Sequence, residues 1–143
     1  NWSLYPGIPI GCVDWPTPFT SYDEVAAAMN LVAVASPHVL GATQTWNNSI
    51  SCLGWPVPVA NPPARLDVQG TPPILIVNAT YDPSTAYVWA QLLHEQIANS
   101  ILLTRHGSGH TTYLLPGESQ TRDAIDAYLI DLELPAPNTI FEN

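Results

Sequence analysis

Hydrophobic and polar positions in the second half of the chain alternate in runs typical of strands and helices. Residues 74–77 form a continuous apolar run, as expected of a strand buried on both faces in a parallel sheet, and residues 101–104 predict a second strand. Between them a helix is predicted from about Ser84 to Ala98. Its apolar positions repeat at helical spacing: Ala86, Trp89, Leu93 and Ile97. A last helix is predicted from about Thr121 to Leu132, and this order implies a right-handed parallel crossover.

The first 70 residues follow a different pattern, rich in Pro, Trp and small residues. One helix is predicted there, because Ser21 and Glu24 form a capping-box pattern ahead of the apolar run Val25 to Ala35. From Trp46 to Thr71 we expect loop, because prolines interrupt any regular element. We therefore divide the chain into a loop-rich, lid-side excursion segment, residues 1–70, and a segment of strands and helices, residues 71–143.

Two predicted strands are too few for a stable open sheet with both faces covered. The fold class expected from this pattern is α/β, with parallel strands and crossover helices. We expect the rest of the sheet to come from another chain or from a missing N-terminal part.

Composition narrows the class of protein. Hydrophobic residues make up 46% and charged residues 10% of the 143 residues, which is too apolar for a disordered chain. No apolar run reaches the roughly 18 residues of a membrane-spanning helix. The net charge is −9, with three Arg and no Lys, so binding to nucleic acid or to an anionic membrane surface is not expected.

Cysteines and glycosylation sequons point to an oxidising, extracellular setting. Cys12 and Cys52 are the two cysteines, and we favour a bridge between them over two separate buried thiols. Asn1, Asn47 and Asn78 begin Asn-x-Ser/Thr sequons. Asn47 is the best candidate of the three, because it lies in a polar stretch, whereas Asn78 falls at the end of a predicted strand. The predicted location is therefore secreted.

Two ionisable residues follow the two predicted strands. Asp82 comes after the first strand and His110 after the second, and the carboxyl ends of parallel strands are where functional residues gather in open α/β sheets. The order acid then histidine is that of an α/β-hydrolase, where the nucleophilic serine comes first. His110 would be the general base, and Asp82 would hold its imidazole in the right tautomer. The alternatives are a helix-capping Asp82 and a solvated loop His110.

The residues around these two positions resemble the C-terminal domain of the tripeptidyl-aminopeptidase-like α/β-hydrolases, which are secreted serine exopeptidases and related hydrolases. The likeness is carried mainly by Pro73 to Val77, Tyr81 to Ala86, Gly107 to His110, Cys12 to Asp14, Cys52 to Pro56 and Thr121 to Ala124. The resemblance implies that Asp82 and His110 are the acid and base of a catalytic triad. It also implies a disulfide between Cys12 and Cys52.

One departure from the family pattern matters for function. The chain has no Gly-x-Ser-x-Gly elbow, so the nucleophile and the oxyanion hole must lie on another chain or on a missing N-terminal part. Together with the Asn1 start, this suggests a product of internal cleavage, partnered by the N-terminal chain of the same precursor.

The expected function is that of the C-terminal chain of a secreted, processed serine hydrolase, an aminopeptidase-like exopeptidase acting on peptides or on small esters or amides. The alternatives are a non-catalytic secreted binding or structural module, or an esterase or lactonase of the same fold. No cofactor is expected. No metal is expected either, because His106 and His110 have no third ligand at metal-binding spacing.

Overall fold

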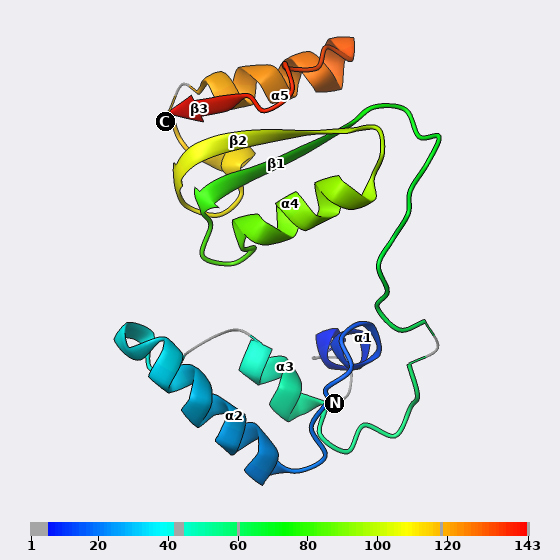
Figure 1. Ribbon diagram of the computed structural model, residues 1–143, viewed down its shortest axis with the longest axis vertical. Coiled ribbons are helices and arrows are strands. Elements are labelled where there is room, and N and C mark those ends of the chain that lie inside the picture. The colour runs from blue at the N-terminus through cyan, green and yellow to red at the C-terminus, as the bar shows by residue number, and fades with distance from the viewer. Residues whose placement is uncertain (1–5, 42–44, 60, 118, 143) are drawn as a thin grey trace. The chain divides into compact units, whose positions relative to one another are not determined.

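The computed structural model describes residues 6–41, 45–59, 61–117 and 119–142, and the chain divides into two units, Asn1–Ala64 and Arg65–Asn143 (Figure 1). The division falls ahead of the boundary after residue 70 that the sequence suggested. The reason is hydrogen bonding to the second unit: Val68 forms a parallel bridge with Ile97, and the Asn99 side chain donates to the carbonyl of Thr71 at 2.9 Å. These contacts attach residues 65–71 to the second unit.

Helices make up the regular structure described in the first unit. They are α1 (Gly7–Asp14), α2 (Tyr22–Ala35), the 3-10 helix η2 (Pro37–Val39) and α3 (Thr45–Ser51). The predicted start of α2 is confirmed, because the Ser21 hydroxyl oxygen accepts from the Glu24 N–H at 3.3 Å and Glu24 Oε2 accepts from the Thr20 N–H at 2.7 Å. The prediction of loop from residue 46 onward was wrong at its start, where α3 forms.

A disulfide and a close helix contact hold α1 against α3. Cys12 and Cys52 form the bridge and are both buried, so the alternative of two separate thiols was wrong. Gly11 allows the close approach, since a Cβ there would lie 2.6 Å from Oδ1 of Asn48. The same Asn48 donates to the carbonyl of Trp15 at 3.1 Å. Contacts distant in sequence therefore support two short helices whose local pattern was weak.

The second unit contains a parallel sheet in the order β1-β2-β3 within the described residues: β1 (Ile74–Tyr81), β2 (Ser100–Ser108) and β3 (Ile140–Glu142). The first two strands confirm the prediction, although β2 continues through residues expected to be loop. The third strand was not predicted, because three residues carry too little periodicity to be recognised without their partner.

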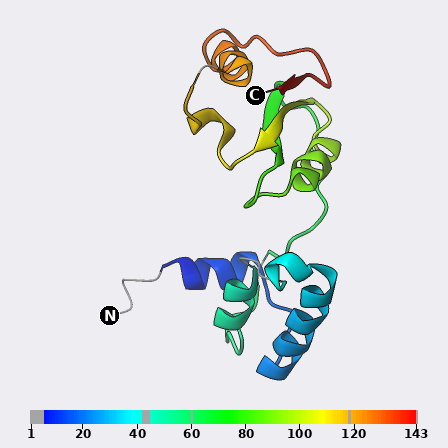
Figure 2. The same cartoon turned by 90° about the vertical axis from the view of Figure 1, so that its left-hand side faces the viewer.

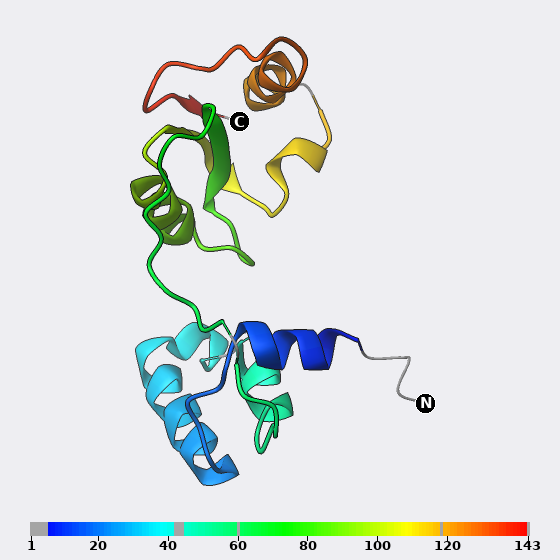
Figure 3. The same ribbon diagram turned by 90° about the vertical axis from the view of Figure 1, so that its right-hand side faces the viewer.

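Helices cover both faces of this sheet. Figure 2 and Figure 3 show α4 (Tyr87–Gln96) on one side of the strands, and the 3-10 helix η3 (Thr112–Leu114) with α5 (Gln120–Asp131) on the other. Leu103, Ala79 and Thr121 are fully buried between these layers. The order strand, helix, strand, helix is thus the one that the sequence predicted.

The face that α4 turns to the sheet differs from the expected one. Trp89 and Leu93 of the predicted apolar stripe are 57% and 39% exposed, whereas Ala90 is buried. Tyr87 and His94 lie on the sheet side and make hydrogen bonds to side chains of β2 at 2.6 and 2.7 Å. Among the described residues, the middle of the predicted apolar stripe, Trp89 and Leu93, is therefore exposed rather than packed on the sheet. Within the described ranges, no helix has the length and apolarity needed to cross a bilayer.

Candidate active site

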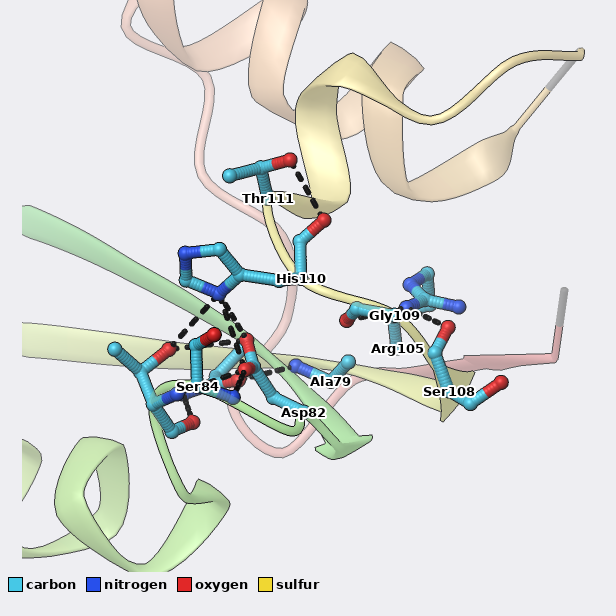
Figure 4. Close-up of polar contacts among 10 residues, drawn as sticks. Ala79, Asp82, Ser84, Arg105, Ser108, Gly109, His110 and Thr111 are labelled. Carbon is cyan, nitrogen blue, oxygen red and sulfur yellow. Dashed lines mark hydrogen bonds and ion pairs between the residues drawn. The ribbon is translucent and has the colours of Figure 1, made fainter. Parts of the chain in front are cut away.

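The two predicted site residues lie at the same edge of the sheet. Asp82 directly follows β1, and His110 lies two residues beyond the end of β2. Because β1 and β2 are parallel neighbours, their carboxyl ends bring the two side chains together, although 28 residues separate them in sequence (Figure 4).

The histidine ring is oriented by the carboxylate. His110 Nδ1 lies 2.9 Å from Oδ2 and 3.0 Å from Oδ1 of Asp82. A carboxylate can only accept, so Nδ1 carries the proton and Nε2 of the neutral ring keeps a free lone pair. The second ring nitrogen is directed away from Asp82 (Figure 4). The His110 side chain is 44% exposed and that of Asp82 only 5%, so the base is accessible and the acid is enclosed.

A tight turn fixes the carboxylate. Asp82 Oδ1 accepts from the N–H groups of Ser84 and Thr85, both at 2.8 Å, and the Thr85 hydroxyl donates to Oδ2 at 3.0 Å. Helix α4 begins later, at Tyr87, and its N-cap is Ala86. The alternative of Asp82 as a helix cap was therefore wrong: the side chain organises the turn between β1 and α4 and presents its oxygens to His110.

The same hydrogen bonds decide the charge of Asp82. Burial raises the pKa of the carboxyl, but hydrogen bonds from the backbone of Thr85, from His110, from the backbone of Ser84 and from the Thr85 hydroxyl outweigh it. Together they lower the pKa from 3.8 to about 2. Asp82 is thus ionised across the neutral range and can stabilise a positive charge on the ring of His110.

The loop that carries His110 is held by arginine side chains that the sequence analysis did not select. Arg105 of β2 donates to the carbonyls of Ser108 and Gly109 at 2.7 and 3.3 Å. Arg122 of α5 donates to carbonyls on the far side of His110. The signal available in the sequence was a charged residue, Arg105, two positions after the apolar run of residues 101–103 in the strand that leads into the histidine loop.

The other candidate residues lie outside this arrangement. His106 pairs with Glu142 of β3, Nδ1 to Oε2 at 2.6 Å, which joins two strands. In the part of the chain that the structure describes, no group of three or more His, Cys, Asp or Glu side chains could hold a metal ion.

The glycosylation candidates separate by burial. Asn78 is 7% exposed inside β1 and its amide donates to the Thr85 carbonyl at 3.1 Å, which argues against a glycan there. Asn47 is exposed on α3 and stays a prediction. Asn1 lies outside the described residues.

A family match shows which protein family the chain belongs to. The family described as TAP-like protein, an α/β-hydrolase family, matches residues 36–140, which include both Asp82 and His110. The chain belongs to the TAP-like family. Its parallel sheet with helices on both faces is accordingly part of an α/β-hydrolase fold.

Curated relatives of this TAP-like chain include named peptidases. The serine protease Hip1 of Mycobacterium tuberculosis is 32% identical over 124 residues, which covers 86% of this chain and 23% of that protein. A tripeptidyl aminopeptidase of Streptomyces lividans is 28% identical over 134 residues, covering 80% of this chain and 24% of that protein. The chain thus spans about a quarter of the length of the relatives it matches.

Proposed function

We propose that this TAP-like chain supplies the acid and the base of a Ser-His-Asp triad to a secreted serine peptidase of the aminopeptidase kind. The observation that carries the proposal is the contact of His110 Nδ1 with Asp82 at the ends of two adjacent parallel strands. Its support is the chain order, acid before histidine, and the names of the relatives, which are a serine protease and tripeptidyl aminopeptidases.

The roles of the two residues follow from their geometry. His110 Nε2 takes the proton of the serine hydroxyl as the oxygen attacks the substrate carbonyl, and it then gives that proton to the departing amine. In the second half of the reaction the same nitrogen activates the water that releases the acyl group. Asp82 stays ionised throughout, because its pKa lies near 2, and it holds the Nδ1–H side of the ring. This chemistry needs no cofactor.

The nucleophile is proposed to lie in an N-terminal part of the parent protein. The 143 residues contain no Gly-x-Ser-x-Gly elbow, and the relatives are about four times as long as the matched region. The outer edge of β1 is the place where further strands would pair, because β1 ends the described sheet and has β2 as its described partner. The exposed apolar side chains of α4, such as Trp89 and Leu93, would be covered in the same assembly.

Secretion is supported by the Cys12–Cys52 disulfide, since such bonds persist in oxidising compartments. A peptide substrate is favoured over an ester by the names of the relatives.

The test uses the full-length parent protein, treated with a fluorophosphonate and analysed by denaturing mass spectrometry. We expect a single labelled serine outside the present 143 residues. Mass spectrometry also reveals whether that serine is on the same polypeptide or on a separate one. Turnover is then measured on peptides with free and blocked N-termini and on small esters.

His110→Ala is expected to abolish both labelling and turnover, and His38→Ala is the matched control, because His38 is exposed on η2. Turnover of the His110→Ala protein at the wild-type rate would overturn the triad assignment. An unlabelled but folded parent protein would favour a binding or structural module. Faster turnover of esters than of free-N-terminus peptides would replace the peptidase by an esterase or lactonase.

A further inference from the structure

We propose that Arg105, together with Arg122, positions the catalytic histidine by holding the backbone carbonyls on both sides of it. This inference rests on the proposed function, in which His110 is the base. Neither arginine touches Asp82 or the His110 ring in the contacts of the described residues, so both act through the loop backbone.

Arg105 lies in the middle strand of the described sheet, in register with Ala79 of β1 and Phe141 of β3. It is only 4% exposed, and no carboxylate pairs with it among the described residues. Burial of a cation is costly, and the Arg105 Nη2 group offsets part of this cost through two hydrogen bonds, while Nε has no hydrogen-bond partner among the described residues. Those bonds go to the carbonyls of Ser108 and Gly109, the two residues that immediately precede His110 (Figure 4).

The loop backbone also packs against the guanidinium. Gly109 has a φ of 109°, a conformation that L side chains rarely adopt, and a Cβ there would meet Arg105 Nη2 and the Leu115 side chain at 3.6 Å. Thr111 on the other side of His110 has a φ of 61°, in the left-handed region. The histidine therefore lies between two residues with a positive φ, and the conformation of Thr111 is unfavourable for an L side chain and persists only where surrounding contacts fix it.

Arg122 supplies the second set of contacts. It extends from the first turn of α5, and its Nε donates to the Tyr113 carbonyl at 3.3 Å while its Nη2 donates to the carbonyl of Leu115. The chain has three arginines and no lysine, so two of its three side-chain cations are committed to this one loop. A planar guanidinium suits the task, because it can donate to two carbonyls in fixed directions, whereas an ammonium acts as a point charge.

Asp82 and His110 are therefore held in place by different contacts. Asp82 is fixed by its own turn, so the distance between its carboxylate and His110 depends on where the loop holds the ring. A displacement of about 1 Å at a catalytic group can lower a rate on the order of 10²-fold. Because the Arg105 side chain is enclosed and acts through the loop backbone, its loss should lower kcat and leave KM nearly unchanged.

The experiment compares Arg105→Met, Arg105→Lys and Arg122→Met in the full-length parent protein. Arg65→Met is the matched control, since Arg65 is an exposed arginine whose partner among the described residues is Glu95, at 3.5 Å. Turnover is expressed per active site titrated with fluorophosphonate, so that unfolded molecules do not count. We expect kcat to fall about 10- to 100-fold in Arg105→Met, with KM within about twofold. The fall should be smaller in Arg105→Lys, and Arg65→Met should show none.

Unchanged kcat per titrated site in both Arg105→Met and Arg122→Met would overturn the proposal and leave the arginines a purely structural role. If Arg105→Met does not fold, Arg122→Met decides, because it releases the same loop from the other side. His110→Ala is assayed in parallel to separate the two ideas. Wild-type turnover in His110→Ala would contradict the proposed function itself. An inactive His110→Ala protein together with fully active arginine variants would contradict only the positioning role.

Discussion

The two units of this chain are held in shape by different means. The first unit, residues 1–64, has a buried disulfide between short helices, and its best-defined helix begins at a capping box. The second unit has no cysteine, and its site depends on strand pairing and on hydrogen bonds to a carboxylate and to loop carbonyls. The covalent link that holds the first unit and the polar contacts that hold the site in the second unit are therefore separated along the sequence. Loss of the disulfide or of the α2 cap should therefore act on stability, whereas loss of the polar contacts around His110 should act mainly on turnover at neutral pH.

Asp82→Asn should change turnover more than any other substitution in the second unit apart from His110→Ala. We expect a loss of kcat of about 10⁴-fold, because the amide no longer holds His110 in the right tautomer. Full-length protein is assayed on the peptide that the wild type cleaves best, with Asp67→Asn as the control, since Asp67 is exposed and bonded to Gln69. A loss below tenfold would assign Asp82 a role in the turn alone.

The second test removes the covalent link in the first unit. The double substitution Cys12→Ser with Cys52→Ser should lower the free energy of unfolding by about 4 kcal/mol, as loop-closure entropy gives for a separation of 40 residues. Hydrogen exchange in the full-length protein shows where protection is lost. The loss should be confined to residues 1–64, with turnover per titrated site unchanged; reduced protection of β1 and β2 would contradict the separation of the units.

A third test uses pH on the second unit. The pKa of Asp82 is lowered in the folded state from 3.8 to about 2, so its ionised form stabilises the fold above pH 3.8. That contribution is lost as the pH falls from 3.8 toward about 2. Wild-type protein should therefore lose more stability over this interval than Asp82→Asn, as measured by denaturant unfolding. Any acid limb of activity well above pH 4 must come from another group.

The smallest expected effect concerns the cap of α2. Ser21→Ala should cost about 1 kcal/mol of stability, because the Glu24 N–H loses its acceptor. The thermal midpoint of the full-length protein measures the loss, and Ser21→Asn, which preserves a capping oxygen, should restore most of it. Turnover should not change in either variant.

The elements that depend on local sequence were predictable, and those that depend on distant contacts were not. The strands β1 and β2 and the helices α2, α4 and α5 were predictable, because continuous apolar runs, helical spacing and a capping box are local signals. Helices α1 and α3 were not, since the bridge between Cys12 and Cys52 and the close contact at Gly11 support them. Strand β3 was missed because three residues acquire their structure from pairing with β2.

The site shows a similar limit. Asp82 and His110 could be placed together because the ends of parallel strands are fixed by topology. The orientation of α4 could not be predicted. Its periodic pattern assigned Trp89 and Leu93 to the buried face, but both are exposed. The partners of Arg105 could not be predicted either. Its acceptors are backbone carbonyls, and every residue type has one, so the sequence does not indicate which carbonyls are used.

The small number of basic residues also determines where trypsin can cleave the chain. Trypsin cleaves after Lys and Arg, so it has three possible sites here. Arg105 is buried in β2, and Arg122 belongs to helix α5, whereas the Arg65 side chain is 69% exposed and Arg65 begins the second unit. Brief digestion of the native protein should cut first after Arg65, because exposed, irregular segments are nicked before folded ones. A single enzyme would then separate the disulfide-bonded unit from the unit that carries the catalytic pair.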